Sequence, residues 1–397
     1  KMSSCTGISI PVLIVFTFIS QVFVSFYHEG DFGIVFVEAF HVVGKRSNHN
    51  NNNIKNRIFQ APKRNNNKRL NDFMIGVLPM SSSSSSSSIE HDSDDGVASS
   101  ARSLGLFLTT PLLLSRPLTD LMGDRNNPVY IKLDALQPSG SFKDRGMAHL
   151  CDTLHKGGTQ KLISSSGGNA GLAVATVGGR LGMEVDVIVP KTTKALVIDK
   201  LKSLGADVTV HGENWNEADL MARQRVQEDA TAEYVSPYDN PLLWHGHSTI
   251  IDELLQEIPK DTNNNNDNVG AIVVSVGGGG LICGVLEGLH RHDRFDIGVV
   301  AAETEGAASF GKAWEKGELI RLDAIESVAT SLGALEVTEE ALIRAKAHEA
   351  KNGILQTAIC TDKEAVEACV RFAQDHRILV EPACGAALAA VYSDRLR

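Results

Sequence analysis

The stretch Ala271-Ile-Val-Val-Ser-Val-Gly-Gly-Gly-Gly-Leu281 decides the fold, because an apolar run passes directly into four consecutive glycines. The run Ala271–Val276 is rich in β-branched residues, which is typical of a strand buried in a parallel sheet. A helix is expected to follow over Ile282–Leu289. The glycines leave the backbone N–H groups of the turn unobstructed, and such a nest of N–H groups binds an anion of phosphate size. The stretch therefore predicts a strand, an anion-binding loop and a helix.

Short apolar runs alternate with helix-length segments along the chain from Thr109 onward. Strands that alternate with helices indicate βαβ units and a parallel sheet, so we expect an α/β fold. The other expected strands are Val129–Leu133, Lys161–Ser164, Val185–Val189, Asp207–His211 and Val299–Ala302, and the expected helices include Ala170–Leu181 and Thr193–Leu204.

The composition excludes some classes of function. The 397 residues carry 38 basic and 48 acidic side chains, so the formal net charge is −10. An acidic chain argues against nucleic acid as the main partner. The six cysteines have no Cys-x-x-Cys spacing, which favours scattered reduced thiols over a disulfide framework or a zinc site.

Residues 1–105 differ in composition from the rest of the chain. Residues 1–109 hold ten basic and eight acidic side chains, a balance of +2, so the remainder carries −12. An apolar run from Ile8 to Tyr27 precedes a basic, asparagine-rich stretch and the serine tract Ser81–Ser88. Such a composition buries too little apolar surface to offset chain entropy. We expect a disordered targeting leader over 1–105, and a catalytic part that works in the cytoplasm or in an organelle after its removal.

Two other interpretations of the leader stay open. About 18 to 20 apolar residues can span a bilayer, so the run could be an anchor, although Ser20, Gln21 and Ser25 interrupt it. Alternatively, the segment is translated upstream sequence, and Met74 or Met80 is the true start. No membrane contact is expected for the catalytic part.

A candidate catalytic lysine lies in Ser139-Gly-Ser-Phe-Lys-Asp-Arg-Gly146, which follows Pro138. The segment predicts a turn that enters a helix, with Lys143 in the first helical turn. The positive end of the helix dipole lowers the pKa of a lysine there, and a lowered pKa suits a lysine that forms a Schiff base. Taken alone, such a lysine is more often a surface residue.

Two further segments place small residues at the start of a helix. Ser164-Ser-Ser-Gly-Gly-Asn-Ala-Gly171 follows an expected strand, and its backbone N–H groups and hydroxyls predict a carboxylate or phosphate site. Leu379-Val-Glu-Pro-Ala-Cys-Gly-Ala-Ala-Leu388 predicts a strand that runs into a helix, with Cys384 near the helix N-terminus.

A dinucleotide-binding fold is the competing interpretation of the tetraglycine turn. The turn lies between a strand and a helix, and Glu303 ends the next strand at a suitable distance. The glycine spacing fails, however, because Ile282 or Cys283 stands where the last glycine is required. Nicotinamide binding is therefore not expected.

Together, these four motifs resemble the pyridoxal-phosphate (PLP) enzymes of the tryptophan-synthase β family, fold type II. Their order and spacing match from about Thr110 to the last residue, and residues 381–393 narrow the resemblance to the L-serine dehydratase branch. The resemblance implies a two-lobed, three-layer αβα fold with parallel sheets. It also implies a small domain at 142–238 and a large PLP-binding domain at 106–141 plus 239–397.

The resemblance implies an activity, which is elimination of L-serine to pyruvate and ammonia, with L-threonine giving 2-oxobutanoate as a side activity. It also implies a homodimer and a place in amino-acid catabolism and gluconeogenesis. Lys143 would hold PLP as a Schiff base and then take the α-proton of the substrate. The implied ligands are Phe142, Lys143, Asn169, Gly277, Gly278, Gly279, Gly280, Leu281 and Cys384 for PLP, Ser166, Gly168, Asn169 and Ala170 for the substrate, and Glu303, Ala307, Ser309 and Leu332 for a monovalent cation such as K⁺.

A thiol at the pyridine nitrogen would favour elimination. Cys384 would be a weak partner that does not keep this nitrogen protonated, so a long-lived carbanion is disfavoured. Prompt loss of the β-hydroxyl, with a proton from the cofactor phosphate, is then the favoured route.

Two residues depart from the family pattern. Gly167 stands where these enzymes often carry alanine, and Ser331 stands where a small apolar residue usually covers the ring. The preference between serine and threonine therefore stays open. No isoleucine feedback is expected, because only 13 residues follow Cys384.

Other functions of the same fold remain as alternatives. One is a serine racemase or a β-replacing synthase, and a racemase needs a second base on the opposite face of the cofactor. Another is an inactive sensor that binds PLP or an amino acid. The intact Lys143 and the intact glycine loop argue against a sensor.

Overall fold

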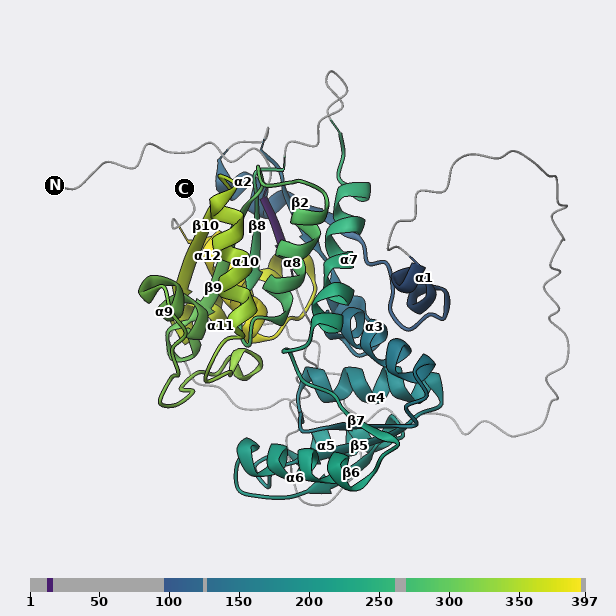
Figure 1. Cartoon of the computed structure of the whole chain (residues 1–397). Coiled ribbons are helices and arrows are strands. Elements are labelled where there is room, and N and C mark those ends of the chain that lie inside the picture. Colours follow the sequence, from purple (N-terminus) through teal and green to yellow (C-terminus); the bar gives the residue numbers. More distant parts are fainter. Residues whose placement is uncertain (1–12, 17–95, 124–126, 261–268, 394–397) are drawn as a thin grey trace, which may run out of the picture. The chain divides into compact units, whose positions relative to one another are not determined.

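The computed structural model describes residues 13–16, 96–123, 127–260 and 269–393. Two β-sheets organise these residues (Figure 1), a six-stranded sheet of order β10-β9-β8-β1-β3-β2 and a four-stranded sheet of order β6-β5-β4-β7. Helices connect most of the consecutive strands, as parallel pairing requires. The expected α/β fold with parallel sheets is confirmed.

The six-stranded sheet is parallel except at one edge, where β2 runs antiparallel to β3. Every residue of β8 and β9 is buried, which explains why these strands appear in the sequence as continuous apolar runs. The strands are β1 Leu13–Phe16, β2 Leu112–Ser115, β3 Val129–Lys132, β8 Ala271–Ser275, β9 Gly298–Thr304 and β10 Leu355–Cys360.

The four-stranded sheet is parallel throughout. Its strands all fall within 142–238, the range that the sequence analysis assigns to the small domain. They are β4 Lys161–Ser164, β5 Glu184–Val189, β6 Asp207–Val210 and β7 Ala232–Tyr234.

The described part of the chain contains twelve α-helices and three short 3₁₀ helices. The α-helices are α1 Gly96–Ser103, α2 Arg116–Met122, α3 Lys143–Lys156, α4 Asn169–Leu181, α5 Ala195–Ser203, α6 Trp215–Glu228, α7 Pro241–Glu257, α8 Gly280–Arg291, α9 Ser309–Lys316, α10 Glu339–Ala350, α11 Asp362–His376 and α12 Pro382–Tyr392. The 3₁₀ helices are η1 Asp134–Leu136, η2 Glu305–Ala307 and η3 Thr330–Leu332.

The six strands expected from the sequence all form, each within two residues of its expected ends. One further expectation was wrong, because the residues before α12 form no strand. Pro382 removes a ladder donor there and begins the helix instead. Strands β1, β2, β7 and β10 were not expected from the sequence, and β7 has only three residues.

Two described segments fall within the expected leader. Strand β1 pairs with β3 on one side and with β8 on the other. In α1, Ala101 is fully buried and Arg102 pairs with Glu253 at 2.9 Å. The folded part of the chain therefore begins before residue 106. The rest of the leader prediction, including the serine tract, Met74 and Met80, concerns residues outside the described ones.

No helix among the described residues is long and apolar enough to cross a membrane.

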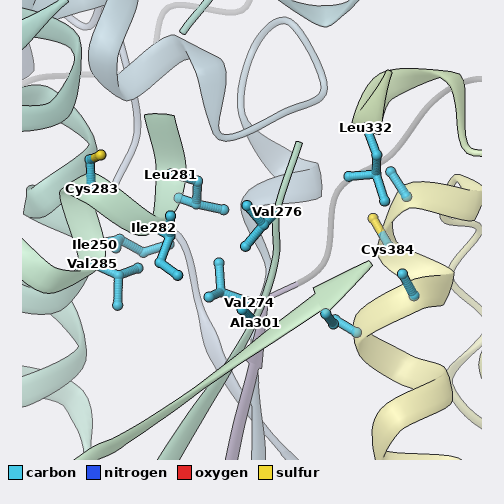
Figure 2. Packing of buried hydrophobic residues seen from close by; sticks show 14 of the residues in the cluster. Ile250, Val274, Val276, Leu281, Ile282, Cys283, Val285, Ala301, Leu332 and Cys384 are labelled. Carbon is cyan, nitrogen blue, oxygen red and sulfur yellow. The ribbon is translucent and has the colours of Figure 1, made fainter. Parts of the chain in front are cut away.

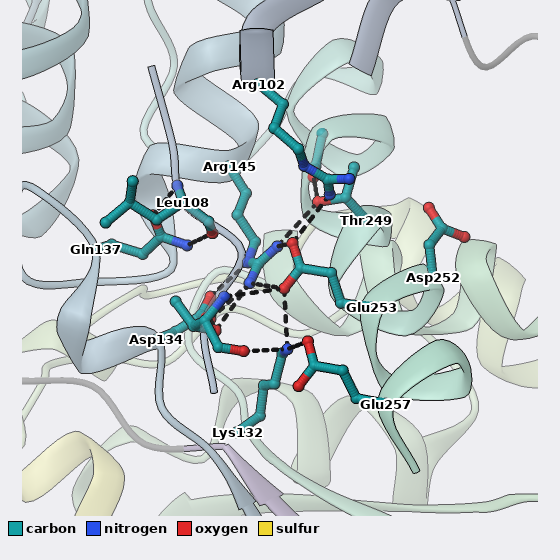
Figure 3. A network of polar contacts seen from close by, with 12 residues as sticks. Arg102, Leu108, Lys132, Asp134, Gln137, Arg145, Thr249, Asp252, Glu253 and Glu257 are labelled. Carbon is teal, nitrogen blue, oxygen red and sulfur yellow. Dashed lines mark hydrogen bonds and ion pairs between the residues drawn. The ribbon is translucent and has the colours of Figure 1, made fainter. Parts of the chain in front are cut away.

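A buried cluster of charges joins β3, η1, α3 and α7 (Figure 3). The guanidinium of Arg145 is fully buried and donates to Asp134 at 2.6 Å and to Glu253 at 2.7 Å. The ammonium of Lys132, also fully buried, lies 2.9 Å from Glu253 and 2.9 Å from Glu257. Burial alone would raise the pKa of Glu253, but its hydrogen bonds and the two cations outweigh burial and lower it. The cluster therefore fixes the first turns of α3 by charge-assisted hydrogen bonds.

We expect Arg145→Met to destabilise the fold by about 3–5 kcal/mol, because it leaves Asp134 and Glu253 buried without their cation. Urea unfolding measures the change. Lys191→Met is the matched control, since the Lys191–Glu213 pair is exposed on both sides and should leave the unfolding midpoint almost unmoved. Equal midpoints for the two variants would contradict this account of the cluster.

Candidate active site

A cavity of about 720 Å³ lies at the ends of strands from both sheets. Segment 166–170 follows β4 of the small sheet, and segment 276–281 follows β8 of the large sheet. Phe142 and Lys143, at the start of α3, complete this part of the wall. The carboxyl ends of parallel strands are where open α/β sheets bind ligands. The three motifs that the sequence analysis singled out therefore meet at one cavity.

Lys143 lies in the cavity wall and has a lowered pKa. Its Nζ donates to the carbonyl oxygen of Pro237 at 2.6 Å and lies 5.0 Å from the centroid of the Phe142 ring. Burial lowers the pKa of Lys143 from 10.5 to about 8, against the opposing effect of the Glu381 charge. The sequence predicted a lowered pKa from the helix dipole, and burial is the main cause in the structure. A substantial fraction of this amine is therefore neutral and nucleophilic near pH 8.

The tetraglycine turn leads into the N-terminus of α8. A Cβ at Gly278 would lie 2.3 Å from the Tyr238 ring, and one at Gly277 would lie 2.9 Å from the Cα of Leu332. Gly279 has φ +92°, which favours glycine. The first N–H groups of a helix have no acceptor within the helix, so the turn can bind an anion.

The serine-glycine segment after β4 forms a second turn of this kind. Gly168 precedes α4, which begins at Asn169 and runs for 13 residues. A Cβ at Gly171 would lie 1.7 Å from the carbonyl oxygen of Ser166, so only glycine lets the segment fold back on the helix. Ser166 and Ala170 also line the cavity, which places the expected carboxylate ligands together.

The sequence analysis missed the role of Glu381. Its Oε1 accepts a hydrogen bond from Asn169 Nδ2 at 2.7 Å, and its Oε2 accepts one from Ser331 Oγ at 2.7 Å. All three residues line the cavity. The available signal was a carboxylate directly before the proline that begins α12.

Cys384 does not line the cavity. It is fully buried on α12, and Figure 2 shows its sulfur directed toward the segment that carries Leu332. The thiol is directed toward η3, whose Leu332 lines the cavity. Its contact with the pyridine nitrogen stays a prediction.

Two of the four residues expected to bind a monovalent cation lie beside the glycine turn. Ser309 Oγ is 3.5 Å from the carbonyl oxygen of Gly277, and Leu332 lines the cavity. Both oxygens of Glu303 accept hydrogen bonds, from the N–H groups of Phe310 and Gly311. Burial raises the pKa of Glu303 to about 8. Ala307 is buried in η2.

A cluster of three or more histidine, cysteine or acidic side chains that could hold a metal ion is absent from the described residues. A monovalent cation can instead be held by backbone oxygens, so the cation site stays a prediction.

The fold and the cavity define a site that can hold a phosphorylated cofactor, because a partly buried lysine and backbone N–H groups lie in one wall. The family model for pyridoxal-phosphate dependent enzymes matches residues 105–397. The chain belongs to this family.

Several relatives are named for one reaction. The chain is 40% identical over 310 residues to an L-serine dehydratase of Dictyostelium discoideum, which covers 76% of this chain and 86% of that protein. It is 43% identical over 288 residues to an L-serine dehydratase/L-threonine deaminase of Mus musculus, which covers 72% of this chain and 84% of that protein.

Solved structures share the fold. A fungal L-serine ammonia-lyase from Rhizomucor miehei matches with a TM-score of 0.64 at 34% identity, over 72% of this chain and 87% of that chain. Maize serine racemase matches with a TM-score of 0.67 at 22% identity, over 77% of this chain and 88% of that chain. This second likeness concerns the fold alone.

The residues of the cavity fit PLP. A lysine of lowered pKa can take the cofactor aldehyde, and the glycine turn at the start of α8 can take its phosphate. Phe142 offers an aromatic side chain beside the lysine. At Gly277 and Gly278 the backbone of the turn packs directly against Leu332 and the Tyr238 ring, which leaves no room for a side chain.

The amine of Lys143 should become half-labelled by an acylating reagent near pH 8 in the protein without cofactor, because burial lowers its pKa. Peptide mass spectrometry after brief labelling measures the profile. Lys191 is the internal control, since its hydrogen bond to Glu213 raises its pKa above 10.5. Coincident profiles for the two lysines would contradict the assignment.

Gly278→Ala should weaken PLP binding by about tenfold or more, since its Cβ would displace Tyr238 from the glycine turn. Absorbance titration with PLP measures the dissociation constant. Gly298→Ala is the matched control, because its Cβ would meet neighbouring atoms only at ordinary contact distances of 3.5 Å or more. Unchanged PLP affinity in the Gly278 variant would show that the turn does not hold the phosphate.

Proposed function

We propose that this chain is a PLP-dependent L-serine ammonia-lyase, which converts L-serine to pyruvate and ammonia and L-threonine to 2-oxobutanoate. The observation that carries the proposal is the partly buried Lys143 with its lowered pKa, placed at one cavity with two helix N-termini that can hold anions. Relatives that are 40–43% identical and named for serine and threonine support this substrate class.

When bound, PLP supplies an electron sink for the pair that remains on Cα after proton loss. Lys143 is the base for that proton, because its lowered pKa leaves part of the amine neutral near pH 8. The carbonyl oxygen of Pro237 accepts from Nζ and holds the amine in place. A base held in this way loses little further side-chain entropy when it removes the Cα proton.

The substrate carboxylate would bind at the N-terminus of α4. Ser166, Gly168 and Ala170 line the cavity there, and the positive end of the helix faces the anion. The phosphate would bind at the N-terminus of α8 in the same way. The two anions would thus be held apart by separate backbone turns, which orients the substrate between them.

A racemase needs a second base on the other face of the cofactor. Three serines line the cavity, and two of them already donate hydrogen bonds: Ser331 to Glu381, and Ser275 to the carbonyl oxygen of Ala383. The names of the relatives, and not these bonds, favour elimination over racemisation for this chain. Gly167, also in the wall, has no side chain to serve as a base.

The test uses the full chain purified with PLP and incubated with L-serine. We expect a visible absorbance band, pyruvate and ammonia in equal amounts, and 2-oxobutanoate from L-threonine. Lys143→Ala should abolish the band and all turnover. A band without pyruvate would reject the lyase, and formation of D-serine as the main product would assign a racemase instead.

We also propose a homodimer, and a catalytic part that acts in the cytoplasm or in an organelle. Both proposals follow from the family resemblance and from the composition of the first 105 residues. Sedimentation velocity of the full chain tests the dimer, and a fluorescent fusion to residues 1–105 tests the compartment.

A further inference from the structure

We propose that Glu381 is a positioning residue that fixes the side-chain amide of Asn169 for PLP, and that Ser331 holds the Glu381 carboxylate in place. The inference rests on the proposed function, because Asn169 is a residue that the family resemblance implies as a PLP ligand, through the hydroxyl of the cofactor ring. It assigns a role to Ser331, which departs from the small apolar residue usual in the family.

The three residues come together from distant parts of the chain. Asn169 begins α4, Ser331 lies in η3, and Glu381 directly precedes α12. Each carboxylate oxygen of Glu381 has one donor at 2.7 Å, the amide of Asn169 on Oε1 and the hydroxyl of Ser331 on Oε2. The side chain of Glu381 is thereby held from two sides, at the wall of the cavity.

The backbone of Glu381 is fixed as well. Its carbonyl oxygen accepts hydrogen bonds from the N–H groups of Cys384 and Gly385 at 2.9 and 3.1 Å, and from the thiol of Cys369 at 3.3 Å. Only 6% of the residue is exposed. A glutamate whose backbone and carboxylate are both held by hydrogen bonds is a rigid acceptor, which a positioning role requires.

The chemistry of the amide explains what Glu381 can do. A carboxylate accepts hydrogen bonds and an amide nitrogen donates them, so Glu381 determines which end of the Asn169 side chain faces it. One N–H of Asn169 is then committed to Glu381. The second N–H and the carbonyl oxygen are left for a ligand, in a single orientation.

The charge on Glu381 depends on its neighbours. The groups that face it are Lys143 from α3, Asn169 from α4, Ser331 from η3 and Cys369 from α11. Burial raises the pKa of Glu381, while the two hydrogen bonds and the charge of Lys143 lower it. Loss of the Ser331 hydroxyl should therefore raise the pKa of Glu381 further.

A double-mutant cycle on the dissociation constant of PLP tests the positioning role. The full chain is prepared as wild type, Glu381→Ala, Asn169→Ala and the double variant, and each is titrated with PLP. If Glu381 acts through Asn169, Glu381→Ala weakens PLP binding by about tenfold in the wild type and by less than about twofold in the Asn169→Ala background. Equal losses in both backgrounds would overturn the proposal.

The role of Ser331 and the charge of Glu381 are tested by titrating the visible absorbance of bound PLP with pH. We expect one midpoint of this titration to belong to Glu381. Ser331→Ala should move that midpoint to higher pH, and Glu381→Gln should abolish it. An unchanged midpoint in Ser331→Ala would remove Ser331 from the proposal, and a midpoint that persists in Glu381→Gln would assign it to another group.

Glu364→Ala is the matched structural control. Glu364 completes the capping box of α11, so this variant should lower the melting temperature and leave the PLP dissociation constant unchanged. If Glu381→Ala behaves in the same way, its role is structural and the proposal fails. Failure of the proposed function looks different, because then the wild type itself shows no band or no pyruvate.

Discussion

The buried guanidinium of Arg145 is the constraint on which the site depends. Arg145 lies two residues after Lys143, and its partners Asp134 and Glu253 come from η1 and α7. A buried charge is very costly without hydrogen-bonded counter-charges, so this arrangement tolerates little displacement of α3. The start of α3 is thereby fixed against the large sheet. The position of the Lys143 amine follows from that.

Close backbone approach is the second constraint, and it falls on particular glycines. Gly278 accommodates the ring of Tyr238, and Gly171 accommodates the carbonyl oxygen of Ser166. In both turns the absent side chain lets a neighbouring group approach the backbone at the start of a helix. Anion binding by backbone groups needs no arginine, which explains how an acidic chain can hold two anions at one cavity.

Local sequence predicted the local parts of the site. The glycine turns and Lys143 could be found because each lies at a strand-to-helix or turn-to-helix junction that is encoded within about ten residues. Contacts between distant segments could not be found. The hydrogen bonds of Glu381 reach residues 50 and 212 positions away. The pattern of apolar and polar residues in the sequence also does not predict that Cys384, three residues after Glu381, is absent from the cavity wall.

The same distinction applies to the sheets. The β-branched runs predicted β4, β5 and β8 closely, because those strands are buried in the sheet interior. The edge strand β10 alternates irregularly between buried and exposed residues, and β1 pairs with strands more than 100 positions away. Pairing partners at such separations depend on tertiary packing, and a single sequence does not specify them.

The pH response of the site should therefore reside in a few side chains. Backbone N–H groups do not titrate, so the two anion turns keep their affinity for a given anion across the physiological range. Lys143 and Glu381 are both pushed toward their neutral forms by burial, while each charge favours the other. In the protein without cofactor, the unfolded chain binds the Lys143 proton more tightly between pH 8 and 10.5. Stability from this group thus rises with pH across that window, since the cost of burying the ammonium disappears.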